Sequence, residues 1–159
     1  MRGPAGARMG AIARSSLEEP SRPASESPSR PRVVLIDDDD LFRESIRLNL
    51  CDEGFDVVDF NGGAPALAYF SAGADADAII LDWKMPEING LDVLMKIKEE
   101  KPATKVIIMT AYGSSDTKAK AKARGSLFYI EKPFEIDQMR DLILKALKEG
   151  GIKVIDISE

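Results

Sequence analysis

The sequence contains no histidine, and this absence excludes more kinds of site than any other feature of its composition. Without an imidazole there is no Ser-His-Asp or Cys-His catalysis, no histidine metal ligand and no phosphohistidine on this chain. Cysteine occurs once, as Cys51, which excludes a disulfide framework and a multi-cysteine zinc site. A single cysteine also suits a reducing compartment, so we expect a cytoplasmic protein.

Long apolar runs and a strong positive charge are also lacking. No apolar stretch approaches the roughly 20 residues of a membrane-spanning helix, so we expect no such helix. The net charge of −5 gives no general attraction to nucleic acid. The 159 residues, 44% of them apolar, suffice for one buried core and are too few for two ordinary domains.

Three segments of the chain differ in composition. Residues 1–31 are rich in Pro, Ser, Gly, Ala and Arg and poor in large apolar residues, which predicts a disordered tail. Residues 32–149 are expected to form the folded domain. Residues 150–159 begin with two glycines and are predicted to be a loosely held C-terminal tail, with a short docking strand as the alternative.

Within residues 32–149, short apolar runs alternate with stretches of helical period. This alternation is typical of repeated β–α units around a parallel sheet, so we predict an α/β fold. The predicted strands are 33–36, 55–60, 78–81, 105–109 and 127–130, and the predicted helices are 41–51, 65–71, 91–100, 115–124 and 135–149.

Polar side chains stand at the carboxyl ends of four predicted strands, where open parallel sheets bind their ligands. Asp37 and Asp38 follow the first strand and Asp82 follows the third, while Thr110 ends the fourth and Lys132 follows the fifth. Three carboxylates at one edge would repel one another unless a hard cation or a buried lysine compensated them. We therefore predict a Mg²⁺ site here, with Lys132 beside it.

These residue types suit phosphoryl transfer, which needs positioning and charge neutralisation more than covalent machinery. Asp82 can accept the phosphoryl group, because carboxylates form aspartyl phosphates. Lys132 would neutralise phosphoryl charge, and the Thr110 hydroxyl would donate to a phosphoryl oxygen. A run of aspartates can also be a solvated turn that caps a helix, and we expect that role for Asp39 and Asp40.

In order and spacing, the motifs resemble those of the response-regulator receiver domains, over about residues 32–149. Among these, the chain is similar to the single-domain, chemotaxis-type regulators. The resembling segments are VVLIDD at 33–38, DWKMPEING at 82–90, IIMTA at 107–111 and YIEKPF at 129–134.

The resemblance implies a flavodoxin-like, doubly wound (βα)5 fold with a five-stranded parallel sheet in the strand order 2-1-3-4-5. It implies Mg²⁺ bound by Asp38, Asp82 and the backbone carbonyl of Lys84, with Asp37 assisting through water. A cis peptide bond before Pro133 also belongs to the family pattern.

The resemblance also implies a switch. A histidine kinase or histidine phosphotransfer protein would phosphorylate Asp82, so the protein would be no enzyme beyond its own phosphorylation and dephosphorylation. Thr110 and Tyr129 would then move and alter the surface of the fourth helix, fifth strand and fifth helix. Alternatives are a phosphorylation-independent adaptor and a phosphatase that uses Asp37 and Asp39 as a D-x-D pair.

Nothing after residue 151 has the pattern of a helix-turn-helix. We therefore expect no DNA binding of its own, with output through a separate protein effector or by phosphate relay. We also expect no membrane attachment, and either a monomer or a phosphorylation-dependent dimer.

Two features depart from the common pattern. Lys84 and Tyr112 stand where the family tunes the lifetime of the phosphoryl group, and their size favours slow self-dephosphorylation unless both side chains point to solvent. The predicted helix 115–124 alternates basic residues with alanine, so its apolar face is thin. Such a helix can dock an acidic partner, stay solvated, or be weakly held.

Overall fold

The structure is a computed structural model, and it describes residues 30–149. Every predicted strand and helix is present, with bounds within two residues of those expected from the hydrophobic pattern. Along the chain the elements are β1 (Arg32–Ile36), α1 (Asp40–Asp52), β2 (Asp56–Phe60), α2 (Gly63–Ser71), β3 (Ala78–Asp82), α3 (Gly90–Glu100), β4 (Val106–Thr110), α4 (Ser115–Ala123), β5 (Phe128–Glu131) and α5 (Ile136–Glu149).

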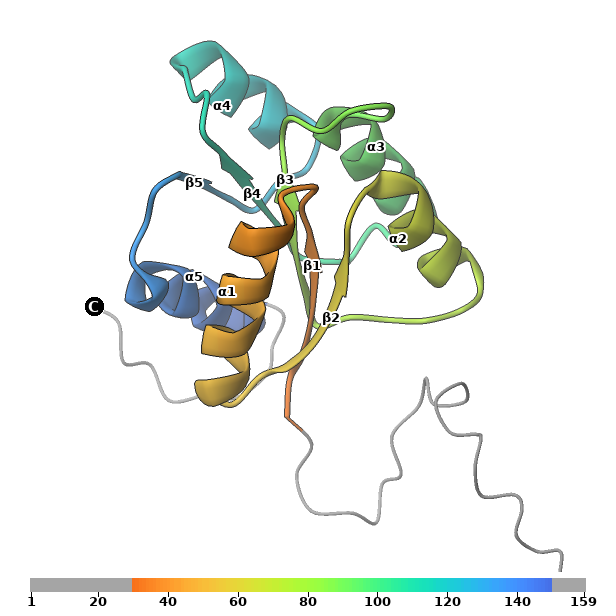
Figure 1. Ribbon diagram of the computed structural model, residues 1–159. Helices are drawn as coiled ribbons and strands as arrows, with labels where there is room; N and C mark the ends of the chain where they lie inside the picture. Colours follow the sequence, from red (N-terminus) through yellow and green to blue (C-terminus); the bar gives the residue numbers. More distant parts are fainter. Residues whose placement is uncertain (1–29, 150–159) are drawn as a thin grey trace, which may run out of the picture.

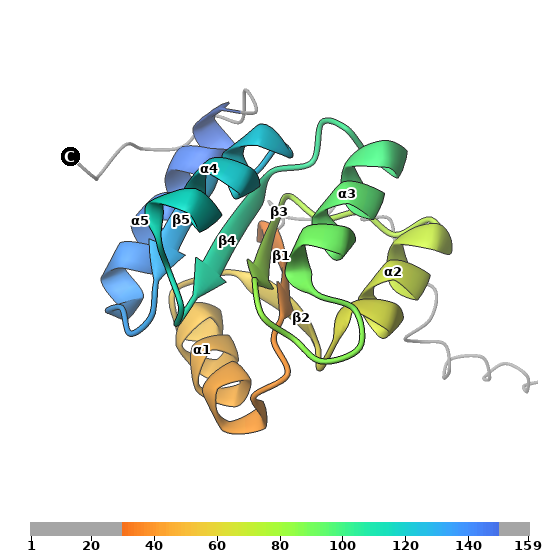
Figure 2. The same ribbon diagram turned by 90° about the horizontal axis from the view of Figure 1, so that it is seen from above.

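The five strands form one parallel sheet in the order β2-β1-β3-β4-β5, which confirms the predicted doubly wound fold. Helices α1 and α5 cover one face, and α2 and α3 cover the other (Figures 1 and 2). Helix α1 connects β1 to its neighbour β2 on one face of the sheet, and α2 connects β2 to β3, the other neighbour of β1, on the opposite face. The carboxyl ends of β1 and β3 therefore flank the point where the strand order reverses, which is where such sheets bind ligands.

The core explains why the central strands read as continuous apolar runs. All five residues of β3 and of β4 are buried, because helices cover both of their faces. On β1, Val33 and Leu35 pack with α1 and α5, whereas Val34 and Ile36 pack with α2, α3 and Ala121 of α4. This packing holds the strand ends in register at the edge where the polar residues lie.

Local chemistry sets the ends of the helices. Asp39 is the N-cap of α1, and its side chain accepts a hydrogen bond from the Phe42 amide at 3.1 Å. The predicted capping role of Asp39 is thereby confirmed. After α1 the chain turns at Gly54, whose φ of 106° lies in the left-handed region that favours glycine.

Helix α4 is held by little apolar contact. Ala121 is its one buried residue within the described part of the chain, and its alternating lysines are exposed. The thin apolar face expected from the sequence is therefore present.

The predicted tails fall almost wholly outside the described residues, namely in 1–29 and 150–159. Arg30 and Pro31 are described, and the Arg30 side chain donates to the Cys51 carbonyl at 3.0 Å. Between residues 30 and 149, no helix is both long enough and apolar enough to span a membrane.

Candidate functional site

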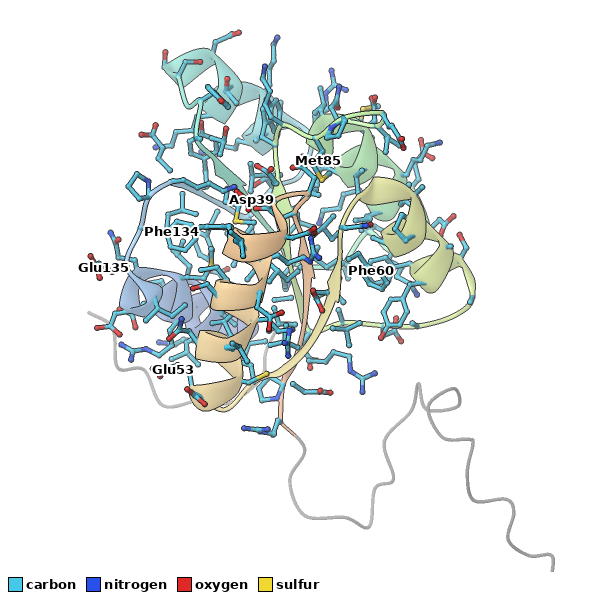
Figure 3. The ribbon with its side chains drawn as sticks, in the orientation of Figure 1. Asp39, Glu53, Phe60, Met85, Phe134 and Glu135 are labelled. Carbon is cyan, nitrogen blue, oxygen red and sulfur yellow. The ribbon has the colours of Figure 1, made fainter. Side chains whose placement is uncertain are left out.

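Three carboxylates converge at the carboxyl edge of the sheet. Asp37 and Asp38 follow β1, and Asp82 is the last residue of the neighbouring strand β3. One carboxylate oxygen from each lies within 4.8 Å of those of the other two. Asp37 is fully buried and Asp82 is 5% exposed, whereas Asp38 is exposed. The end of the molecule that carries them is marked by Asp39 and Met85 in Figure 3.

Asp37 is held at every polar atom. Its Oδ2 lies 2.8 Å from the Lys132 Nζ, and its Oδ1 accepts from the Asp39 amide at 2.8 Å. Its amide donates to the Phe60 carbonyl at 3.1 Å, and its carbonyl accepts from Arg43 Nη1 at 2.8 Å. Asp38 accepts no hydrogen bond within residues 30–149. Asp82 accepts from the Lys84 amide and lies farther from Lys132 than Asp37 does, so Asp38 and Asp82 keep the most capacity to bind a cation directly.

Lys132 supplies positive charge beside these carboxylates. Its Nζ lies 3.7 Å from Asp82 Oδ1, in addition to its contact with Asp37. The same ammonium lies 4.2 Å from the ring centroid of Phe42. The Phe42 ring in turn packs edge-on against Phe134, with 5.8 Å between the two ring centroids. The Lys132–Pro133 peptide bond is cis, as the resemblance implied.

The charges of the site are not balanced by the protein alone. Burial raises the pKa of Asp82 from 3.8 to about 7; the charge of Asp37 adds to the rise and Lys132 offsets part of it. A proton thus competes for Asp82 near neutral pH. A hard divalent cation would also supply positive charge beside the ionised carboxylates. Carboxylate oxygens are the ligands that Mg²⁺ prefers, so these residues fit that ion.

Thr110 and Tyr129 lie on the adjoining strands. Thr110, at the end of β4, is buried, and its Oγ1 accepts from the Tyr112 amide at 3.0 Å. Tyr129 on β5 is paired with Ile108 of β4. Its hydroxyl is buried and makes no hydrogen bond of ordinary geometry within residues 30–149. Burial raises the pKa of Tyr129, and the nearby Ser114 amide only partly opposes this.

Comparison with known proteins identifies the domain. The sequence model of the response regulator receiver domain matches residues 33–144, well over half of the chain. The chain belongs to the response regulator receiver domain family.

Two curated relatives and one solved structure illustrate the similarity of this receiver domain to others. It is 31% identical over 122 residues to the regulatory protein AtoC of Escherichia coli (strain K12), covering 77% of this chain and 26% of AtoC. It is 34% identical over 115 residues to the DNA-binding transcriptional regulator NtrC of the same strain, covering 72% and 24%. A CheY-like receiver domain from Methanospirillum hungatei JF-1 superposes with a TM-score of 0.74 at 26% identity, covering 77% of this chain and 98% of that one.

These relatives correct one prediction. The chain spans about a quarter of the length of AtoC and NtrC, so in those proteins the receiver domain is part of a larger regulator. NtrC is a DNA-binding regulator. The expected partners, a separate protein effector without DNA binding of the protein's own, are therefore wrong. That expectation rested on the few residues after position 151, which cannot report on the architecture of regulators of this kind.

Lys84 and Tyr112 lie two residues beyond Asp82 and Thr110, on the loops that follow β3 and β4. Both are exposed, and the Lys84 Nζ lies 5.4 Å from the ring centroid of Tyr112, so the loops after β3 and β4 contact each other through this pair. A cavity of about 300 Å³ opens next to Lys84 and is lined by Trp83, Lys84, Asn89, Leu91 and Lys120.

Sequence reasoning missed the residues of α1 and β2 that support the acidic loop. Arg43, in the first turn of α1, contacts Asp37, Asp40 and Asp59. Phe42, also on α1, places its ring beside the Lys132 ammonium. The available signal was Asp59, because a charged residue inside a strand needs a partner.

Proposed function

We propose that this receiver domain accepts a phosphoryl group on Asp82 from a phosphohistidine donor, and that phosphorylation changes the surface formed by α4, β5 and α5. The observation that carries the proposal is the buried carboxylate of Asp82, with its pKa raised to about 7, beside two further carboxylates and Lys132. Perturbed titratable groups of this kind gather at functional sites. Apart from its own phosphorylation and dephosphorylation, we propose no enzymatic activity.

The chemistry proposed for Asp82 is a direct displacement at phosphorus. A bond forms between an Asp82 carboxylate oxygen and phosphorus while the bond between phosphorus and the donor's imidazole nitrogen breaks. The leaving nitrogen keeps the electron pair of that bond and takes up a proton. Lys132 lies close enough to Asp82 to neutralise a phosphoryl oxygen, and Asp37 holds its ammonium in place.

We propose Mg²⁺ as the resident cation, held by Asp38, Asp82 and the Lys84 carbonyl. Asp37 would act through water, because Lys132 and the Asp39 amide already engage both of its oxygens. When bound, the ion supplies the positive charge that three carboxylates and a phosphoryl group require. The acidic cluster supports this assignment, since burial, together with the charges of Asp37 and Asp38, raises the pKa of Asp82 and so disfavours its ionised form without a cation.

The switch would pass from Thr110 to the outer surface. The Thr110 hydroxyl would give up the hydrogen bond that it accepts from the Tyr112 amide and donate to a phosphoryl oxygen instead. This movement would draw the loop after β4 toward the site. The Tyr129 hydroxyl, which makes no hydrogen bond of ordinary geometry within residues 30–149, could follow. Helix α4 would move at low cost, because Ala121 is its one buried residue in the described part of the chain.

The two alternatives have less support. A phosphatase would use Asp37 and Asp39, yet Asp37 is held at both oxygens and Asp39 caps α1. A phosphorylation-independent adaptor would gain nothing from a buried carboxylate cluster whose repulsion is unfavourable. The cytoplasmic location expected from the single cysteine also remains a proposal.

One experiment separates the three functions. The protein is incubated with acetyl phosphate and Mg²⁺ and weighed intact, beside the variants Asp82→Asn and Asp37→Asn. A single added phosphoryl group that is lost in Asp82→Asn supports the proposal. Turnover of a small phosphate ester that survives Asp82→Asn but not Asp37→Asn supports the phosphatase, and neither adduct nor turnover supports the adaptor.

A further inference from the structure

Arg43 joins three separate parts of the domain through three different nitrogen atoms. Its Nε lies 2.7 Å from Asp59 Oδ2 on β2, and its Nη2 lies 2.9 Å from Asp40 Oδ1 at the start of α1. Its Nη1 donates to the backbone carbonyl of Asp37 at 2.8 Å. The Arg43 side chain is only 15% exposed, and that of Asp59 is 27% exposed, whereas Asp40 is 80% exposed, so the contact with Asp40 is the one that faces water. A planar guanidinium is suited to this task because its donors point in fixed directions.

The three contacts of Arg43 surround the segment that carries Asp38. The Asp38 carboxylate accepts no hydrogen bond from residues 30–149. The direction in which this side chain points therefore depends on the backbone on either side of it. On one side Arg43 holds the Asp37 carbonyl, and on the other Asp39 caps α1. Asp59 anchors the guanidinium to β2 and so to the sheet. Arg43 is therefore one of the contacts that hold the backbone on either side of Asp38.

We propose that Arg43 is a positioning residue for cation binding at this site. It keeps the β1–α1 loop in the conformation in which Asp38 shares one ion with Asp82. This inference rests on the proposed Mg²⁺ site, but it concerns a residue that would not touch the ion.

Charge and position make opposite predictions for Arg43, which allows a sharp test. The guanidinium is a cation that contacts the backbone of Asp37 at the edge of the site, so by charge alone its removal would strengthen the binding of a second cation. If Arg43 instead holds the loop, its removal would weaken binding despite the lost repulsion. The sign of the change therefore separates the two effects.

The test compares Mg²⁺ affinities of Arg43→Met, Arg43→Lys and the control Arg47→Met. Arg47 also lies on α1 and approaches the same Asp59, at 3.9 Å, but within residues 30–149 it makes no contact with residues 37–40. The Kd is measured from the fluorescence of Trp83, the only tryptophan and the residue after Asp82, and independently from the rise of Tm with Mg²⁺.

We expect Arg43→Met to raise the Kd by about 10- to 100-fold, the usual effect of losing a residue that orients a metal ligand. Arg43→Lys should recover little of this, because one ammonium cannot reach three partners at once. Arg47→Met should leave the Kd within about twofold of the wild type, inside the usual variation at uninvolved surface sites.

An unchanged or lower Kd in Arg43→Met would overturn the inference, even with reduced stability, because a merely structural role lowers the free energy of unfolding without weakening cation binding to the folded protein. If Arg43→Met does not fold, Asp59→Ala replaces it, because this change removes the anchor on β2; Arg47→Met is the control for the accompanying loss of the Arg47–Asp59 approach. A raised Kd in that variant supports the inference and an unchanged one overturns it. Failure of the wild type to bind Mg²⁺ in both readouts would contradict the proposed function itself.

Discussion

Replacing Asp82 by asparagine is expected to stabilise the metal-free protein at pH 8. The wild-type carboxylate is 5% exposed and close to Asp37, so its ionisation opposes folding. Asparagine keeps the shape of the side chain and can accept the hydrogen bond that the Lys84 amide offers Asp82. Lys132 is not left unpaired, because its closer partner is Asp37 at 2.8 Å.

The magnitude follows from the pKa of Asp82, which rises from 3.8 to about 7 on folding. At about 1.4 kcal/mol per pKa unit, the full cost of ionisation is at most about 4 kcal/mol. Because the folded pKa is the higher one, this cost is absent below pH 3.8, grows as the pH rises and is complete above about pH 7. Allowing for relaxation and for burial of the amide, we expect a gain of about 1–3 kcal/mol at pH 8.

The assay is urea unfolding in EDTA at pH 8 and pH 5, with Asp52→Asn as the control. Asp52 ends α1, is exposed and forms no ion pair within the described residues, so its replacement removes the same charge without touching the site. The gain of Asp82→Asn should shrink markedly at pH 5. A loss of stability at pH 8, a gain that ignores pH, or an equal gain in Asp52→Asn would refute the reasoning.

Three further predictions concern the surroundings of the site. Gly90→Ala should lower the free energy of unfolding in urea by about 3 kcal/mol, because a Cβ there meets the backbone where β3 ends. The control Gly62→Ala should be nearly neutral, because a Cβ there points into open space. Equal losses in the two variants would contradict this. Tyr129→Phe should leave the free energy of unfolding unchanged or raise it by up to about 1 kcal/mol, because the lost hydroxyl is buried and makes no hydrogen bond of ordinary geometry within residues 30–149. A clear loss of stability would contradict this. Lys84 and Tyr112 are exposed but contact each other, so together they could still obstruct an attacking water. Replacing both by alanine should then shorten the lifetime of the phosphorylated protein several-fold, measured by loss of the adduct mass; an unchanged lifetime would refute this obstruction.

The fold was predictable because its strongest signals are local and agree with one another. The buried runs of β1, β3 and β4 alternate with helical patterns, and glycine turns separate them. Parallel topology then brings strand ends together, so Lys132 and Asp37 could be expected at one edge although 95 residues separate them. The same reasoning led to Asp38 and Asp82.

The support of the site was not predictable in this way. Arg43 has the spacing of an ordinary surface residue of α1, and its contact with Asp59 depends on how that helix lies against β2. The cation–π contact between Lys132 and Phe42 depends equally on the packing of side chains from different elements. No pattern along the chain encodes such contacts. The architecture of the larger regulators that contain this domain likewise came from comparison with relatives.

The most direct measurement of the central claim locates the phosphoryl group itself. The protein is phosphorylated with acetyl phosphate and Mg²⁺, reduced with borohydride, which converts an acyl phosphate on aspartate to homoserine, and sequenced as peptides by tandem mass spectrometry. The account predicts homoserine in place of Asp82 and at no other aspartate. Homoserine in place of Asp37 or Asp38, or none at all while the protein binds Mg²⁺, would contradict it.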